Sequence, residues 1–310
     1  MRYIILLFLI ITENIIAGEI FCDVRYNSKD NKSCLFFYEN GIYKKNILIN
    51  GNVNKIEWSK NKPELLIDFC DKNKSKIVKY CYKRNIFIKI DSKNVFFDND
   101  SVICKYKFDK INDNTYEVNI NKYSGELIDK FNMFISGSVP LELMPINKGY
   151  LIFVYDEYGK FSFYKVLGKT VNRITSFNSY QCDERPIVSY DGNYVYFSAG
   201  FGQGHKIIEL NLNSGKLNTV IDNVGTICDN YSDISSYVIS GSKNLLYFLS
   251  DDEDAASLYY YDKIKGKSKK CPLTDGCKYE YERRYISISP EYDLIEKWVF
   301  NRLYFNIFQF

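Results

Sequence analysis

Histidine is almost absent from this chain, and its absence removes several kinds of catalytic and metal site. His205 is the only histidine among 310 residues. A Ser-His-Asp or Cys-His catalytic arrangement would have to use it. The chain also has no Cys-x-x-Cys pair, so the usual Cys/His zinc sets cannot be assembled. We therefore predict no metal site, and we place His205 in an exposed glycine-rich turn over residues 200–206.

The motifs of serine hydrolases and nucleotide-binding proteins are missing as well. No Gly-x-Ser-x-Gly elbow occurs anywhere in the chain. Two segments resemble the end of a phosphate-binding loop, Gly168-Lys169-Thr170 and Gly266-Lys267-Ser268. The earlier glycine that such a loop requires is replaced by Phe163 in one case and by Tyr261 in the other. We predict no catalytic residues, no cofactor and no nucleotide site.

Proline and net charge are also low. Six prolines and no long Gly/Ser tract leave no candidate for an interdomain linker. The formal net charge of +3 is too small to indicate the basic face of a nucleic-acid-binding protein. Lysines do cluster between Lys72 and Lys89, interleaved with apolar residues, and we interpret this segment as a solvated strand face.

One acidic run, Asp251-Asp252-Glu253-Asp254, could supply oxygen ligands to calcium. The ligand spacing of an EF-hand is missing, however, and the run lies between two apolar segments. We interpret it as a solvated hairpin turn.

Aromatic residues are plentiful, and they belong to a repeated pattern. Tyrosine (28) and phenylalanine (22) dominate an aromatic fraction of 17%, which favours strands. Residues 186–216 read as a turn, an apolar strand, a second turn, an alternating strand and a closing turn; residues 237–267 and 147–166 repeat this order. Phe153, Phe197 and Phe248 lie at equivalent positions, 44 and 51 residues apart. Repeats of this length with short strands predict a β-propeller.

Weaker copies extend the pattern toward both ends of the chain. Further repeat starts lie at residues 27–30, 56–63 and 288–291, and residues 116–126 repeat the second half of the pattern. We predict an all-β propeller of seven four-stranded blades, with six as the close alternative. Strands from the N- and C-terminal parts would pair to close the ring, because closure removes exposed sheet edges.

The repeats resemble those of TolB-like propellers and of the N-terminal propeller of dipeptidyl-peptidase IV. The segments that carry the resemblance are Ser189-Tyr190-Asp191-Gly192 and Ser287-Ile288-Ser289-Pro290-Glu291, together with the strand ends in Phe and the Gly-Lys turns. The resemblance covers most of the chain after residue 50. It implies a propeller fold, while the hydrolase domain that accompanies related propellers is not expected.

The N-terminal residues have the pattern of an export signal. Arg2 provides a positive charge, residues 4–11 are apolar, and Ala17 and Gly18 are small enough for cleavage. This apolar run is too short to span a bilayer. We expect residues 1–18 to be a signal peptide and residues 19–310 to be a single propeller domain, secreted or periplasmic, with no membrane span after cleavage.

Nine cysteines in an exported chain make disulfides plausible, and the odd number leaves at least one unpaired within the chain. Cys70 with Cys81, and Cys271 with Cys277, could each close a local loop. N-glycosylation acceptor patterns occur at four positions, which are Asn31, Asn73, Asn99 and Asn230.

These observations favour a non-catalytic scaffold that binds a protein or a small ligand through its loops. The most irregular loops are residues 135–140, 198–206 and 250–257. One alternative is a glycoside-hydrolase-like enzyme, with carboxylates that converge on the central channel. A second is a degenerate propeller of an exported peptidase that lacks its hydrolase domain.

Overall fold

The computed structural model of the chain describes most residues between 20 and 288. The described ranges are 20–39, 42–135, 137–156, 161–177, 186–189, 191–201, 204–221, 238–241, 245–252, 255–270 and 283–288. Every regular element within these ranges is a β-strand. The all-β prediction is therefore confirmed.

The described strands form six antiparallel sheets of four strands each. The first contains β24 (Arg283–Ile288), β1 (Ile20–Asn27), β2 (Lys32–Glu39) and β3 (Ile42–Asn50). The second contains β4 (Asn52–Trp58), β5 (Glu64–Asp71), β6 (Lys74–Cys81) and β7 (Ile86–Ile90). The third contains β8 (Val95–Phe97), β9 (Ile103–Asn112), β10 (Thr115–Lys122) and β11 (Leu127–Phe134).

The remaining three sheets follow in chain order. The fourth contains β12 (Ser138–Ile146), β13 (Gly149–Asp156), β14 (Phe161–Leu167) and β15 (Thr170–Phe177). The fifth contains β16 (Ile187–Val188), β17 (Tyr194–Phe201), β18 (Gly204–Asn211) and β19 (Leu217–Ile221). The sixth contains β20 (Val238–Gly241), β21 (Leu245–Asp252), β22 (Ala255–Asp262) and β23 (Lys267–Lys270).

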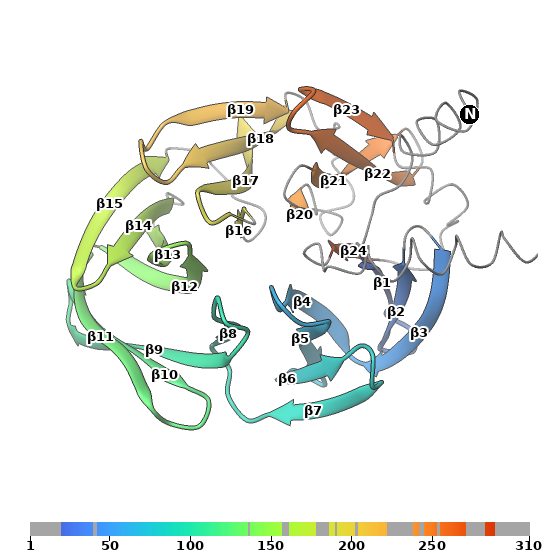
Figure 1. The fold of residues 1–310 in the computed structure, drawn as a ribbon, viewed down its shortest axis with the longest axis horizontal. Coiled ribbons are helices and arrows are strands. Elements are labelled where there is room, and N and C mark those ends of the chain that lie inside the picture. Colours follow the sequence, from blue (N-terminus) through green and yellow to red (C-terminus); the bar gives the residue numbers. More distant parts are fainter. Residues whose placement is uncertain are drawn as a thin grey trace, which may run out of the picture.

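The sheets are arranged in a ring as the blades of a β-propeller (Figure 1). One edge strand of each sheet lies toward the centre, and these six inner strands are β4, β8, β12, β16, β20 and β24. Each inner strand contacts the inner strands of the neighbouring sheets, and β24 contacts β4 to complete the circle. The outer strand of each sheet lies on the rim.

The first sheet joins segments from the two ends of the described chain. β1 pairs with β24 in a register that runs from Phe21 opposite Ile288 to Tyr26 opposite Arg283. The predicted repeat start at residues 27–30 is instead the turn between β1 and β2, and the start at residue 288 is the end of β24. Both therefore belong to one sheet. Residues 289–310, on which a seventh blade would depend, lie outside the described residues.

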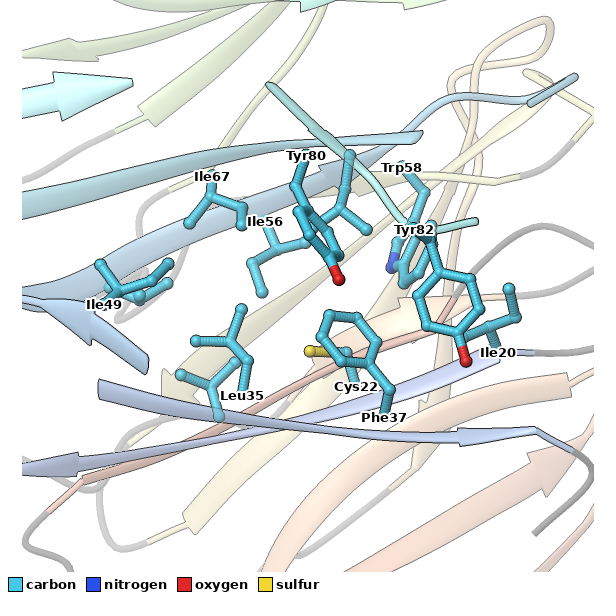
Figure 2. Packing of buried hydrophobic residues seen from close by; sticks show 13 residues of the cluster. Ile20, Cys22, Leu35, Phe37, Ile49, Ile56, Trp58, Ile67, Tyr80 and Tyr82 are labelled. Carbon is cyan, nitrogen blue, oxygen red and sulfur yellow. The ribbon is translucent and has the colours of Figure 1, made fainter. Parts of the chain in front are cut away.

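Aromatic and aliphatic side chains fill the space between neighbouring sheets. In the cluster between the first two sheets, the ring of Phe37 packs against Trp58, Tyr80 and Tyr82 at centroid distances of 6.4, 5.7 and 5.2 Å (Figure 2). Burying each such ring contributes about 2–3 kcal/mol, and aromatic contacts add about 0.5–1.5 kcal/mol. The abundance of tyrosine and phenylalanine is thus explained by packing between blades.

The two ends of the ring differ in their connections. At one end, the first and second strands of a blade are joined by turns such as residues 59–63, 98–102 and 189–193; we call this end the turn face. At the other end, the chain passes from the rim of one blade to the inner strand of the next, as at residues 91–94 and 135–137; we call this end the crossover face. The hairpins between second and third strands also end at the crossover face.

Candidate functional site

Two carboxylates and a lysine meet where inner strands line the ring axis. Lys55 and Glu57 lie on β4, and Glu142 lies on β12. The Lys55 ammonium donates a hydrogen bond to Glu142 Oε1 and lies 3.3 Å from Glu57 Oε2. β4 and β12 belong to the second and fourth sheets, so this contact passes the three-residue strand β8 of the third sheet.

The strand pattern explains how these side chains reach the axis. Val53, Ile56 and Trp58 are buried in the core between the first two sheets. A register shift in β4 between Val53 and Lys55 absorbs one residue, after which side chains alternate between the two sides of the strand. Lys55 and Glu57 therefore emerge on the side of β4 opposite to the core.

Burial and hydrogen bonding affect Glu57 in opposite directions. Burial raises the pKa of the Glu57 carboxyl, and the neighbouring Glu142 raises it further, while Lys55 and the Phe97 N–H lower it. The Phe97 N–H donates to Glu57 Oε1 at 2.6 Å. Both oxygens of Glu57 thus have partners, and one ammonium contacts both carboxylates. The arrangement is a compact ion-pair network.

A second polar network connects the turns of neighbouring blades on the turn face. Lys60 Nζ donates to Asn99 Oδ1 at 2.8 Å, and Asn99 Nδ2 donates to the Ile146 carbonyl at 3.2 Å. Burial lowers the pKa of Lys60, and the carboxylates of Asp191 and Glu57 oppose that shift. These bonds join the second, third and fourth blades, which gives the turn face a structural role.

The crossover face carries exposed apolar side chains over the third and fourth blades. Ile111, Phe134, Val139 and Leu141 have exposed fractions of 55%, 68%, 55% and 51%; we call these four residues the crossover patch. Phe134, at the end of β11, is opposite Thr115 of β10, and Ile111 is the extra residue of a register shift in β9 between Lys110 and Asn112. Leu141 is the extra residue of a register shift in β12 between Pro140 and Glu142.

The topology brings the three irregular loops predicted from sequence to this same face. Residues 135–140 lead from β11 into β12. Residues 198–206 and 250–257 cover the hairpins β17–β18 and β21–β22, whose turn residues 202–203 and 253–254 lie outside the described residues. The first of the three loops lies beside the crossover patch.

Three residues predicted to lie in turns are in strands instead. His205 is the second residue of β18 and pairs with Gly200, because the hairpin closes more tightly than its glycines suggested. Asp251 and Asp252 are the last residues of β21 and pair with Ala256 and Ala255. Strands β21 and β22 are each eight residues long, so their pairing extends beyond the apolar residues and into the acidic run.

The Cys70–Cys81 pairing expected as an option is wrong for this structure. Cys70 is opposite Ser75 and Cys81 is opposite Glu64, at opposite ends of the β5–β6 hairpin. At about 3.3 Å per residue their separation is far beyond the reach of a disulfide. The described cysteines are free thiols, at positions 22, 34, 70, 81 and 104. Cys271 and Cys277 lie outside the described residues, as do residues 1–18 and Asn230.

The axial residues were not found from sequence. The repeat start that the sequence predicts at residues 56–63 overlaps the alternation of Lys55 and Glu57 with Ile56 and Trp58, which belongs to strand β4. That alternation is the signal that could have identified them.

The described residues contain no group of three or more His, Cys, Asp and Glu side chains that could hold a metal ion. Nor do they contain a helix long and apolar enough to cross a membrane.

Comparisons with known proteins agree with the fold. No family model matches the chain, and no curated protein matches it in sequence. TolB from Acinetobacter baumannii has a similar structure, with a TM-score of 0.60, 13% identity, and coverage of 92% of this chain and 70% of that one. A chain from a nidogen/laminin complex has a TM-score of 0.57 at 11% identity and covers 89% of this chain and 100% of that one.

A peptidase matches the chain with a lower score. The acylaminoacyl peptidase of Pyrococcus horikoshii has a TM-score of 0.49 at 12% identity, with coverage of 82% of this chain and 44% of that one. At these identities the likeness concerns the fold alone. The chain is a β-propeller that is similar in structure to TolB at low sequence identity.

Proposed function

We propose that this protein is an exported, non-catalytic binding scaffold that engages a protein partner through the crossover patch. The carrying observation is that Phe134, Val139 and Leu141 are more than half exposed, with Val139 in the irregular loop at residues 135–140 and the other two on either side of it. Monomeric proteins rarely keep large apolar side chains exposed together unless they form a binding site. Bulges such as the one at Leu141 often turn a side chain toward a functional surface.

The axial network supports a scaffold over a glycoside hydrolase. Glycoside hydrolysis needs two carboxyl groups with the scissile bond between them. Here the Lys55 ammonium contacts both Glu57 and Glu142, so it occupies the position that a sugar would need. One similar structure, the chain from a nidogen/laminin complex, comes from a protein–protein assembly.

A photo-crosslinking experiment tests the proposal. The full chain would carry benzoylphenylalanine at position 139 or 141, and matched chains would carry it at Leu167 or Leu217, each 42% exposed and outside the patch. After illumination in an extract of the native source, we expect a discrete crosslinked protein with the first pair alone. Equal labelling from both pairs would contradict the proposal.

A hydrolysis assay separates the enzyme alternative. The wild-type chain and the E57Q and E142Q variants would be incubated with a panel of aryl glycosides. We expect no turnover above buffer from any of them. Turnover by the wild type that both variants lose would establish an enzyme and overturn the scaffold.

Export and blade number complete the proposal. The apolar residues 4–11 with Ala17 and Gly18 support export, and N-terminal sequencing of protein recovered outside the cytoplasm would test cleavage after residue 17 or 18. We propose six blades for the whole chain, since β24 and β1 share a sheet.

A further inference from the structure

We infer that the outer hairpin of the second blade, β6 and β7, is a docking edge for an extended acidic peptide, which would add as a fifth strand to β7. This surface lies on the rim and is separate from the crossover patch, so it goes beyond the proposed function. Three properties of the hairpin carry the inference, which are its charge, its exposed apolar residues and its open edge.

The hairpin carries a net positive charge, because its own sequence has basic residues and no acidic ones. Residues 72–90 contain seven lysines and arginines and no acidic residue. Lys76, Lys79 and Lys89 make salt bridges to carboxylates outside the segment, at 2.6, 3.3 and 2.5 Å. The other four basic residues, Lys72, Lys74, Lys83 and Arg84, are exposed and make no salt bridge with any described residue. A partner with acidic side chains would complement them.

Apolar residues are exposed on both sides of β7. Ile86, Phe87 and Ile88 have exposed fractions of 48%, 44% and 44%. Since side chains alternate along a strand, Ile86 and Ile88 lie on one side of the sheet and Phe87 lies on the other. The Phe87 ring is held by Tyr80 at a centroid distance of 4.7 Å. An added strand would cover side chains on both sides at once.

The edge of β7 is open among the described strands. The order of the sheet is β4, β5, β6, β7, so β7 pairs with β6 on one side only. Its outward N–H and C=O groups are available to a further strand, which is the mode of peptide recognition called β-augmentation.

Three kinds of partner could cover such an edge, and charge and geometry favour one of them. A second copy of this edge would oppose lysine and arginine with lysine and arginine, which disfavours self-pairing. A lipid surface would cover the apolar side chains but would leave the strand's backbone groups without partners. An extended acidic peptide satisfies the backbone, the apolar side chains and the basic residues together.

Fluorescence anisotropy with a labelled peptide would test the inference on the full chain. The probe is a peptide of about eight residues that alternates Asp and Glu with Val and Thr, which is the length of a typical strand. We expect salt-sensitive binding, and we expect K83E/R84E to weaken it about tenfold. I88T should weaken it about threefold while it keeps the strand propensity of the site. The control K148E/K169E makes the same charge change at exposed lysines of the fourth blade and should bind within about twofold of wild type.

A second probe isolates the backbone pairing. The same peptide, N-methylated at every second residue, cannot form one row of strand hydrogen bonds and should bind at least about tenfold more weakly. Equal binding of the two peptides, or of wild type and K83E/R84E, would overturn the inference. Binding to phosphatidylserine vesicles that depends on Ile88, without peptide binding, would also overturn it and would assign the edge to a lipid surface. Circular dichroism would confirm that each variant is folded.

Discussion

At the scale of single residues, Glu57 links burial to the pH dependence of stability. The neighbouring Lys55 favours the ionised form of the Glu57 carboxyl and burial disfavours that form. Burial has the larger effect on the pKa. Because the pKa in the folded state is raised above the ordinary 4.5, ionisation costs more in the folded protein than in the unfolded chain. The stability that the protonated group contributes is therefore lost as the pH rises through the folded pKa.

The variant E57Q would test this effect. Glutamine keeps an oxygen for the Phe97 N–H and cannot ionise. We expect the free energy of unfolding of E57Q to rise relative to wild type as the pH increases from about 4 to about 7. Urea unfolding at several pH values across this range would measure it. Parallel curves for the two proteins, or a relative gain by wild type, would contradict the assignment.

At the scale of elements, the turn at residues 189–193 is held by hydrogen bonds within its own sequence and also packs closely against the neighbouring blade. Ser189 Oγ accepts hydrogen bonds from the N–H groups of Asn193 and Tyr194 and donates to Asp191 Oδ1 at 2.5 Å. Gly192 has φ of +68°, in the region that favours glycine. A Cβ at Gly192 would lie 2.3 Å from the backbone nitrogen of Asn147 in the neighbouring blade.

The substitution G192A should therefore lower the free energy of unfolding by more than the strain of a positive φ would by itself. We expect a loss of about 3 kcal/mol or more, since strain of about 1–2 kcal/mol adds to a clash with backbone that cannot move easily. Gly168 is the matched control, because its φ is +57° and a Cβ there would meet nothing within 4 Å. G168A should cost about 1 kcal/mol. Equal losses for the two variants in urea unfolding would refute the role of the blade contact.

The elements predicted from sequence were those with strong apolar or turn signals. Phe153, Phe197 and Phe248 do lie on corresponding second strands, β13, β17 and β21. The turns expected from the Gly-Lys pattern are present at Gly215 and Gly266, whose φ angles are +68° and +62°. The lysine-rich segment between Lys72 and Lys89, interpreted from sequence as one solvated strand face, instead contains two strands, β6 and β7, joined by a turn. Its mixture of lysine and isoleucine does not mark where one strand ends and the next begins.

At the scale of the whole molecule, the pairing of β1 with β24 closes the ring. Cys22 is directly opposite Ser287, and Asp23 is opposite Ile286. Directly opposed residues of an antiparallel pair have Cα atoms about 4.5–5.5 Å apart, which a disulfide can span.

The variant S287C should consequently form a disulfide with the native Cys22 on oxidation. Peptide mass spectrometry without reduction would detect the crosslinked pair. The chain-entropy model gives a stabilisation of about 5 kcal/mol for so long an enclosed loop, measurable as a higher melting temperature. I286C shifts the cysteine by one residue to the other side of the strand and should not link to Cys22. A link in I286C with none in S287C would mean a different register.

The sequence by itself determined the all-β propeller class, the repeat length and the positions of the second and third strands. These follow from local causes, since apolar alternation and glycine turns act within a few residues. The sequence analysis also expected strands from the two ends to pair, but only the tertiary structure decided that β1 and β24 are those strands. It alone brought Lys55 and Glu57 of one blade to Glu142 of another, and it left the edge of β7 open. Such contacts join residues far apart in the chain, and no local pattern specifies which strand lies beside which.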